Sequence, residues 1–591
     1  MYSVKKLKLL PRLLTKNENK LITVLLFVIC AALITVAINW YFANAKIVPA
    51  QGGEYIEGII GAPRLINPLL SQGNEVDQDI TRLLFSGLLK QENSELKPDL
   101  ARSYTISPDN LIYTFVLRDD VYWHDGTPFS ANDVIFTLQS IQNPEFKSPL
   151  FNMLMGVKAT KVNDLEISLT LPGPFAPFAS LMSFGILPQH IWEDIPLETA
   201  HLADFNVKKP IGTGPFMIKS FKKDSRGVIK SYTLIRNERF YNNPPYLETI
   251  TVKFYPNYKE AVDALNNKNI DGINYLPNRY YTAIAQKNNS IYSLFLPQYT
   301  ALFFNKNNNE LLSQHDIRLA LAKAIDKNTL IAQTLDNQGS AIHGPILPGF
   351  AGYDPTLIEP TFNKEEAIAT LEKNKWSRIT KDEFLKLTQT QPSDITTHNE
   401  EIIRQQETTQ TFFWKKDDKI LSLNLTTVDN PETQAVAEYV KKSWEEVGID
   451  TRLTIIPKEQ LLSSIIKPRN YEVLLIGQII GNDPDLYAFW HSSQAESPGV
   501  NLSLYQNEKA DILLEEARKT SNQKEREKKY GEFQNILQED LPAIFLYTPT
   551  YSYVVSNTIK GITIQKITIP ADRFAGIEQW YIKTKRDFTL R

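Results

Sequence analysis

The stretch DVYWHDGTPFSANDV (residues 120–134) places His124 directly beside Asp125, in an aromatic setting. A histidine next to an aspartate can belong to a metal site or to an acid–base site. The local chemistry favours a structural role, because Asp125-Gly126 is a turn pair whose glycine can adopt positive φ. We therefore predict that the pair marks a turn at the end of a strand, and that His124 packs or forms hydrogen bonds without taking part in a reaction.

The second half of this stretch reads as the start of a helix. Pro128 fixes the exit from the turn, and Ser130 is expected to be the N-cap. Asp133 follows three residues later, which is the spacing of a capping box. Its carboxylate is then expected to face backbone amides, so this stretch carries no predicted metal site.

The chain has 591 residues, which exceeds the size of a single hydrophobic core, so at least two domains or lobes are expected. Cys30 is the only cysteine, which excludes a disulfide within the chain and a cysteine metal cluster. The seven histidines form no His-x-His or His-x-x-x-His pair, and neither a Gly-x-Ser-x-Gly elbow nor a Walker loop occurs. We expect no catalytic residues, no metal site and no cofactor.

The N-terminal segment has the features of a membrane helix. Residues 1–45 carry a net charge of +5, and residues 21–43 (LITVLLFVICAALITVAINWYFA) contain no charged side chain. This length can cross a bilayer, and the basic flank predicts that the N-terminus is inside. The remaining residues carry a net charge of −8, which gives no electrostatic footprint for nucleic acid.

Three fates of this segment compete. Ala43-Asn44-Ala45 fits a signal-peptide cleavage site, but the apolar run is longer than a usual signal core. Lipidation at Cys30 is disfavoured because bulky residues precede it. We expect a retained anchor, with residues 44–53 as a short tether and the body outside the cytoplasm at the cell surface or in the periplasm.

Strands and helices alternate through the body, which indicates two α/β lobes. Strands are expected at residues 111–119, 165–171, 248–256, 270–276 and 471–479, the last as a buried parallel strand. Helices are expected at residues 259–267, 316–331 (with Asp316 as N-cap) and 431–449. Residues 377–418 are polar and rich in Thr and Gln, and we expect an exposed, partly disordered insertion.

Several segments together resemble the peptide- and nickel-type extracellular solute-binding proteins of ABC importers, called family 5. The segment LKPDLARSYTISPDNLIYTFVLRDDVYWHDGTPFSANDVIFTLQSI (residues 96–141) is similar to the central signature of that family. The similarity continues, in family order, in IGTGPFMIKSF, LIRNERFY, FFNKNNNELLSQHDIRLALAKAIDK, AEYVKKSWEEVGID, GNDPDLYAFWHS and LPAIFLYTP.

The resemblance implies a two-lobe, periplasmic-binding-protein-like α/β fold of type II (cluster C-like), with an extra domain inserted in the first lobe and an N-terminal transmembrane helix. The implied boundaries are a basic cytoplasmic segment (1–20), the membrane helix (21–43), the tether (44–53), lobe I (54–92, 206–297 and 546–591), the inserted domain (93–205) and lobe II (298–545). A ligand is expected in the cleft between the lobes, enclosed by hinge closure.

The expected site follows from the resemblance and from the rule that ligands bind beyond strand carboxyl ends. The side chains expected to line the cleft are Asn67, Tyr299, Phe303, Asn305, Gln478, Asp483, Asp485 and Tyr487. Peptide-binding members hold the ligand's α-amino group with an acid before this Asp-Pro region, where this chain has Ile479, Ile480 and Gly481. Asp483 is the candidate substitute, and nickel chelates, sugars and other solutes stay open beside peptides.

The expected function is capture of a short peptide or similar solute by a monomer that delivers it to ABC permease and ATPase subunits. A surface hydrolase of peptides or glycans is one alternative, and it would need a catalytic constellation. A receptor or chaperone that uses the same fold without transport is another, and neighbouring transporter genes would argue against it.

Overall fold

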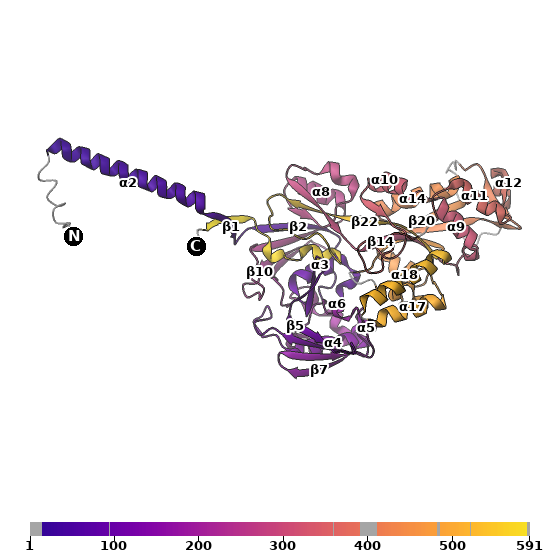
Figure 1. Cartoon of the computed structure of the whole chain (residues 1–591), viewed down its shortest axis with the longest axis horizontal. Coiled ribbons are helices and arrows are strands. Elements are labelled where there is room, and N and C mark those ends of the chain that lie inside the picture. The colour runs from indigo at the N-terminus through magenta and orange to yellow at the C-terminus, as the bar shows by residue number, and fades with distance from the viewer. Residues whose placement is uncertain are drawn as a thin grey trace.

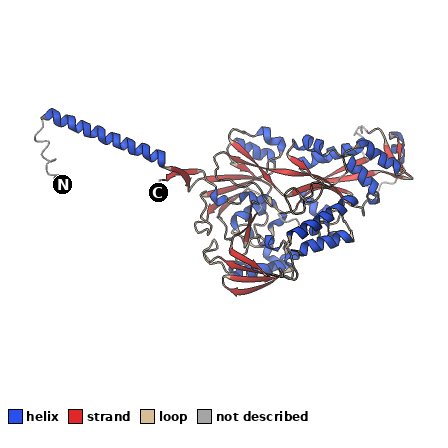
Figure 2. Ribbon diagram, in the orientation of Figure 1, coloured by secondary structure: helices blue, strands red, loops and turns tan. Residues whose placement is uncertain are grey.

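A long mixed sheet runs through both lobes of the molecule (Figure 1). The computed structural model of the protein describes residues 15–93, 95–357, 360–389, 410–481, 485–520 and 522–587. The strand order in this sheet is β20-β19-β21-β14-β22-β12-β2-β11-β10-β9, and β13 and β15 also pair with β22. Helices flank the sheet in both halves, as an α/β fold requires (Figure 2).

The strand bounds divide the sheet into two halves, which we call lobe I and lobe II. Lobe I contains β2 (Glu54–Ile60), β9 (Phe216–Lys223), β10 (Ile229–Arg236), β11 (Thr249–Tyr255), β12 (Gly272–Ile273) and β13 (Asn289–Phe295). Lobe II contains β14 (Gln298–Phe304), β15 (Gly339–Ala341), β19 (Ser422–Val428), β20 (Asp450–Ile456) and β21 (Val473–Ile479). The strand β21 is buried and parallel to β19, as expected, and it is antiparallel to its other neighbour, β14.

Two connections join the lobes. The strand β22 (Ala543–Ser556) pairs with β14 in lobe II through residues 543–547 and with β13 in lobe I through residues 550–556. The second connection is the short passage from β13 to β14. Both crossings lie side by side, because β13 and β14 flank the same strand in succession. Two adjacent crossings of this kind form a hinge about which two rigid bodies can rotate.

The inserted domain is a four-stranded antiparallel sheet with short helices on one face. Its strand order is β5-β6-β8-β7. The strands are β5 (Ala101–Ile106), β6 (Ile112–Leu117), β7 (Lys158–Asn163) and β8 (Glu166–Thr170). The helices are α4 (Ala131–Gln142), α5 (Phe151–Leu154), α6 (Phe178–Leu181) and α7 (Gln189–Trp192). A separate hairpin of β3 (Leu89–Glu92) and β4 (Glu95–Pro98) precedes it.

The larger helices cover the sheet of the two lobes. Lobe I carries α3 (Glu75–Leu84) and α8 (Tyr258–Asn266). Lobe II carries α9 (His315–Lys323), α10 (Lys327–Leu335), α11 (Lys364–Lys373), α12 (Lys381–Gln389), α14 (Pro431–Glu446), α16 (Leu486–Trp490), α17 (Glu508–Lys519) and α18 (Gln523–Asp540).

The single helix expected over residues 316–331 is two helices, α9 and α10, and Gln314 is the N-cap of the first in place of Asp316. The chain breaks because the Asp326 side chain accepts hydrogen bonds from Asn328 N and Thr329 N and starts α10.

The polar segment 377–418 carries some regular structure. Its described residues form β16 (Ser377–Ile379), α12 and β17 (Phe413–Lys416), which pairs with β16 and with β18 (Lys419–Ile420). The rings of Phe384 and Phe413 stack at 3.9 Å, which fastens α12 to this small sheet. Residues 390–409 lie outside the described part of the chain.

The N-terminal helix and the chain end are joined in an unexpected way. The helix α2 (Lys16–Asn44) is followed at once by β1 (Lys46–Ala50), which pairs antiparallel with β23 (Lys583–Asp587). Figure 1 shows this ribbon between the helix and the body, with the C-terminus beside β1. The segment predicted as a simple tether is thus a strand, and its partner strand is far away in the sequence.

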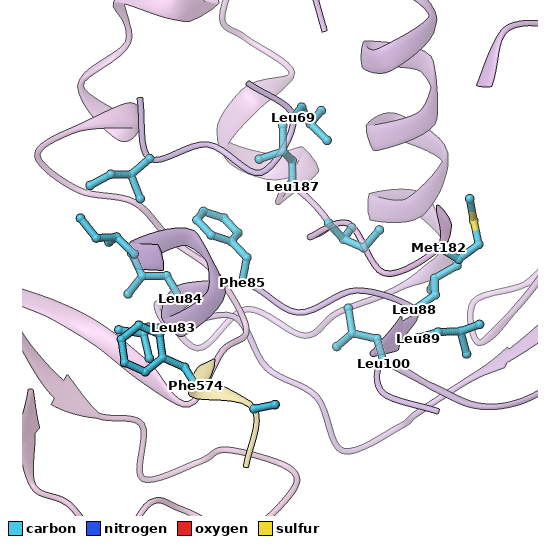
Figure 3. Packing of buried hydrophobic residues seen from close by; sticks show 14 of the residues in the cluster. Leu69, Leu83, Leu84, Phe85, Leu88, Leu89, Leu100, Met182, Leu187 and Phe574 are labelled. Carbon is cyan, nitrogen blue, oxygen red and sulfur yellow. The ribbon is translucent and has the colours of Figure 1, made fainter. Parts of the chain in front are cut away.

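The core of lobe I is continuous with that of the inserted domain. Figure 3 shows Leu83, Leu84 and Phe85 of the α3 region packed near Phe574 from the C-terminal segment. In lobe II, two separate clusters fill the two faces of the sheet, one under α9, α10 and α14 and the other under α17 and α18. Burial on both faces explains the unbroken apolar run in β21.

Candidate ligand-binding site

Three segments far apart in the sequence converge on one tight turn that supports the site. Gly212 N donates to His124 Nδ1 at 3.1 Å, and His124 Nε2 lies 3.1 Å from Gly214 O. Asn237 Nδ2 donates to the same Gly214 carbonyl at 3.1 Å. The stretch that opened the sequence analysis therefore has a structural role, as predicted, because its histidine bonds the turn of a second motif.

The histidine is held neutral by its surroundings. Since Nδ1 of His124 accepts a hydrogen bond from Gly212 N, the ring's own proton must sit on Nε2, which donates a hydrogen bond to Gly214 O. Burial lowers the pKa of His124 to about 4. The next residue, Asp125, has a different hydrogen-bond partner. Its Oδ2 forms a hydrogen bond with His190 Nε2 at 2.8 Å. Asp133 accepts from Ser130 N at 2.9 Å, which is the predicted capping box.

The Gly212–Gly214 turn also holds the C-terminal end of α3. Gly214 N donates to Leu84 O at 2.8 Å. A methyl group at Gly212 would come within 1.9 Å of Leu84 O, so only glycine fits there. This contact fixes α3, which carries the side chains of the pocket described next.

A pocket of about 250 Å3 opens beside α3, between lobe I and the inserted domain. Its uncharged polar lining comes from Ser71, Gln72, Gln78, Thr81, Gln91, Ser180, Ser183 and Thr568. Its apolar lining comes from Pro68, Phe85, Leu150, Met153, Leu181, Phe184, Gly185 and Ile569. A mixed lining of this kind suits a ligand that has both hydrogen-bonding groups and apolar groups.

The charges of the pocket balance each other. Arg82 Nε lies 3.6 Å from Asp572 Oδ1, and Arg82 Nη2 donates to Gln91 O at 3.1 Å. Burial raises the pKa of Asp572, and the Arg82 guanidinium opposes that rise. Thr81 Oγ1 is buried and has no hydrogen-bond partner among the described residues. The pocket thus has little net charge, and a hydroxyl without a partner lies just behind its wall.

Lobe II borders this pocket. A methyl group at Gly481, just beyond the end of β21, would lie 3.9 Å from Thr568 Cγ2 on the pocket wall. Lys458 Nζ of lobe II lies 3.2 Å from Glu75 Oε1, at the start of α3. All of the lining residues come from lobe I and the inserted domain, and lobe II reaches the edge of the pocket, from where closure can cover a ligand.

Arg518, at the end of α17, connects lobe II to the inserted domain. Its Nη2 donates to Asp485 Oδ2 at 2.7 Å, and its guanidinium lies 4.3 Å from the centre of the Tyr487 ring. The same guanidinium lies 4.7 Å from the centre of the Phe175 ring, and Ala176 N donates to Arg518 O at 3.2 Å. Asp485 and Tyr487 thus gather beside this contact, as close neighbours.

The side chains predicted at the start of lobe II lie deeper than a ligand contact. Tyr299 and Phe303 are both buried in the core, 0% and 1% exposed. Tyr299 Oη donates to Gln478 Oε1 at 2.7 Å, and Gln478 Nε2 donates to Val500 O at 3.2 Å. Burial raises the pKa of Tyr299. In this conformation the first two side chains present almost no surface to a ligand, and Gln478 is 8% exposed.

Two predicted asparagines anchor turns. Asn67 Oδ1 accepts from Leu69 N at 2.9 Å, and its amide donates to Asn206 Oδ1 at 3.0 Å. Asn67 is buried, yet Pro68, Ser71 and Gln72 in the same loop line the pocket. Asn305 Nδ2, just after the end of β14, donates to Arg469 O at 2.9 Å. Asp483 lies outside the described residues, so its predicted role stays a prediction.

The lining residues of α3 and the contact residue Arg518 were missed in the sequence. One signal existed for α3, because Gln78, Thr81, Arg82 and Phe85 recur at helical spacing and form one face. The residues after Asn67 could have been included, since they continue the loop that follows the first strand. Nothing in the sequence pairs Arg518 with Phe175, because their contact crosses 343 positions of chain.

Comparison with known proteins agrees with this geometry. The family profile "Bacterial extracellular solute-binding proteins, family 5 Middle" matches residues 95–500. The oligopeptide-binding protein AppA of Bacillus subtilis is 28% identical over 544 residues, covering 90% of this chain and 92% of that protein. The dipeptide-binding protein of Escherichia coli is 24% identical over 535 residues, covering 86% and 91%.

Solved structures give the same result. The structure of AppA from Bacillus subtilis in complex with a nonapeptide matches with a TM-score of 0.74 at 26% identity, over 91% of this chain and 100% of that one. NikZ from Campylobacter jejuni in complex with Ni(L-His) matches with a TM-score of 0.74 at 27% identity, over 89% and 99%. The chain belongs to family 5 of the bacterial extracellular solute-binding proteins and has their two-lobe, type II binding-protein fold.

Proposed function

We propose that this protein is the membrane-anchored substrate-binding subunit of an ABC importer and that its ligand is a short peptide. The pocket between α3, the inserted domain and the end of β21 carries this proposal. Amide and hydroxyl groups such as Gln78 and Thr81 suit peptide main-chain groups, and Met153 and Phe184 suit apolar side chains. A relative of this chain, AppA, is named for oligopeptides.

A nickel chelate is the second candidate, because NikZ matches this chain as well as AppA does by TM-score. The described pocket lining contains no histidine or cysteine, and the described residues hold no cluster of three or more His, Cys, Asp or Glu side chains suited to a metal. A peptide therefore fits the described lining better than a coordinated metal does.

The predicted domain boundaries and the lining role of Gln478, Asp485 and Tyr487 belong to the same proposal. Asp485 and Tyr487 contact Arg518, which in turn contacts the inserted domain, so a movement of the lobes would change their surroundings. Asn67, Tyr299, Phe303 and Asn305 would then act behind the lining, as supports for it. Binding without chemical change follows from the absence of any catalytic constellation in the sequence.

The retained anchor rests on α2. The candidate membrane span within it is Lys16–Trp40, and an 18-residue window of this span has a mean hydropathy of 3.1 and is not buried. A removed signal would leave a soluble protein that starts near Lys46. Retention keeps the binding site close to the importer, which raises its effective concentration there.

The test is mass spectrometry of the small molecules that remain bound to the full chain through purification, repeated after incubation. Peptides of several sequences, unchanged with time, are the expected result. Shortened peptides that accumulate would contradict binding without chemistry, and a reproducible nickel chelate or sugar would contradict the peptide assignment.

A further inference from the structure

The strand ribbon outside the membrane helix concentrates positive charge beside the expected bilayer surface. The register pairs Lys46 with Asp587, Ile47 with Arg586, Val48 with Lys585 and Ala50 with Lys583. All five residues of β23 are exposed. Four basic groups and one acidic group therefore share ten residues, for a net charge of +3.

The membrane end of this ribbon is attached to the last turn of the helix. Arg586 Nη1 donates to Phe42 O at 3.2 Å, and the Arg586 guanidinium lies 4.5 Å from the centre of the Phe42 ring. Trp40 and Phe42 are 55% and 52% exposed, at the depth where an aromatic belt meets lipid headgroups. The contact holds Arg586 at that same level.

The charges of the ribbon have little else to neutralise them. Among the residues that the structure describes, Lys46, Lys585 and Arg586 form no ion pair, and Asp587 is the one acid in the ribbon. Ile47 is 66% exposed and lies opposite Arg586. An exposed apolar residue beside arginine suits an interface between water and lipid.

The position of Lys583 distinguishes it from the other basic residues of the ribbon. A strand rises about 3.3 Å per residue, so Lys583 lies about 10 Å farther along than Arg586 and about 7 Å from Lys585, which shares its face of the strand. The first distance exceeds the screening length of about 8 Å at physiological salt and the second does not, so the direction of the Lys583 side chain is what sets it apart. Lys583 Nζ also points to the body, because it would lie 2.8 Å from a methyl group at Gly52. Lys583 is therefore a natural control with the same charge.

We propose that the β1–β23 ribbon binds anionic phospholipid headgroups of the outer leaflet through Lys46, Lys585 and Arg586. The inference rests on the retained anchor of the proposed function. By holding both chain ends at the surface, the ribbon sets the distance and orientation of the body relative to the bilayer, which a flexible tether would leave open.

The test uses the full chain in nanodiscs that contain equal amounts of phosphatidylglycerol and phosphatidylcholine. Native mass spectrometry after release from the disc weighs the chain and counts the lipids that remain bound. The wild type is expected to retain phosphatidylglycerol in at least about threefold excess. K46Q/K585Q should lower the excess while keeping the Arg586–Phe42 contact, and K46Q/K585Q/R586Q should abolish it. K583Q should retain it, as should the wild type in excess inorganic phosphate.

Three other outcomes would overturn the proposal or a part of it. A full-length mass with no lipid preference, or an equal loss in K583Q, would overturn the headgroup site and leave the anchor in place. An excess that inorganic phosphate removes would overturn the assignment to lipid. A chain that begins near Lys46 when isolated from cell membranes would overturn the anchor, and the lipid site with it.

Discussion

At the scale of single residues, the motifs that carry the family resemblance form hydrogen bonds that hold separate segments of the fold together. His124 and Asn237 bond the Gly212–Gly214 turn from opposite sides of the sequence. Arg318, from a third motif, donates to the carbonyls of Asp540 and Leu541 and caps the end of α18. These residues identify the fold. In the proposed function, ligand recognition falls to side chains such as Gln78 and Met153, which line the pocket and belong to no motif.

Replacing His124 with Ala should weaken the protein without changing its ligand. The substitution removes hydrogen bonds to both Gly212 and Gly214. It leaves Gly212 N unpaired, whereas Gly214 O keeps the hydrogen bond from Asn237 Nδ2. We expect a loss of about 2 kcal/mol in the free energy of unfolding, measured by urea titration. His190→Ala is the matched control, because its pair with Asp125 is 33% exposed on each side and should cost less than about 1 kcal/mol. Equal losses of unfolding free energy in both variants would contradict the structural role of His124.

The same histidine predicts a pH dependence. Its folded pKa is lowered to about 4, whereas the unfolded value is near 6.5. The unfolded chain therefore takes up a proton first as pH falls. The stabilisation is complete above pH 6.5 and is lost progressively towards pH 4, by at most about 1.4 kcal/mol per pH unit. Unfolding titrations of the wild type and His124→Ala across this window should differ in slope, and parallel slopes would contradict the assignment.

At the scale of elements, α3 connects the core to the pocket. One face carries Asp79, whose carboxylate accepts from Arg573 at 2.5 and 2.7 Å. Arg573 Nε also donates to Glu57 Oε1 of β2 at 3.1 Å, and all three side chains are buried. Burial raises the pKa of Glu57, and the Arg573 guanidinium opposes that rise. The other face of α3 presents Gln78, so the triad holds the pocket wall in place.

Replacing Arg573 with Met should leave two buried carboxylates without their cation. We expect a loss of about 3–5 kcal/mol in the free energy of unfolding, measured by denaturant titration. Arg102→Met is the control, because its pair with Asp119 is 51% and 59% exposed and should cost less than about 1 kcal/mol. The triple variant E57Q/D79N/R573M should recover part of the loss, since it removes the unpaired charges. No recovery would argue that packing of Arg573, and not its charge, is what matters.

Elements could be predicted from sequence where local patterns decide them. The alternation at 165–171 predicts β8 (Glu166–Thr170), because one of its faces is buried. The break between α9 and α10 was missed because the Asp326 cap competes with an unbroken apolar stripe. Pairing of β1 with β23 could not be predicted, since no local signal connects strands more than 500 residues apart. The same limit applies to the site, because apolar alternation does not distinguish a buried residue such as Tyr299 from a residue that lines a cleft.

At the scale of the whole molecule, the hinge strands and the site lie on one path between the lobes. Tyr275 of lobe I donates to Glu432 Oε2 of lobe II at 2.5 Å, and Asn278 Nδ2 donates to Leu335 O at 2.6 Å. These contacts lie near the crossings of β22, while the Lys458–Glu75 and Arg518–Phe175 contacts lie near the pocket. Rotation about the first pair of contacts would open or close the second, which is how a ligand enters and is enclosed.

The most direct test of the central claim is calorimetric titration of short peptides into ligand-free full chain, comparing wild type with Met153→Trp and Met155→Trp. Met153 lines the pocket and is 43% exposed, whereas Met155, two residues on, is 60% exposed and is not among the lining residues. The larger ring at 153 fills the pocket, so we predict at least about tenfold weaker peptide binding in Met153→Trp. Met155→Trp should bind like wild type. Equal peptide affinity in all three proteins would contradict the proposed site, and no peptide binding by the wild type would contradict the proposed function.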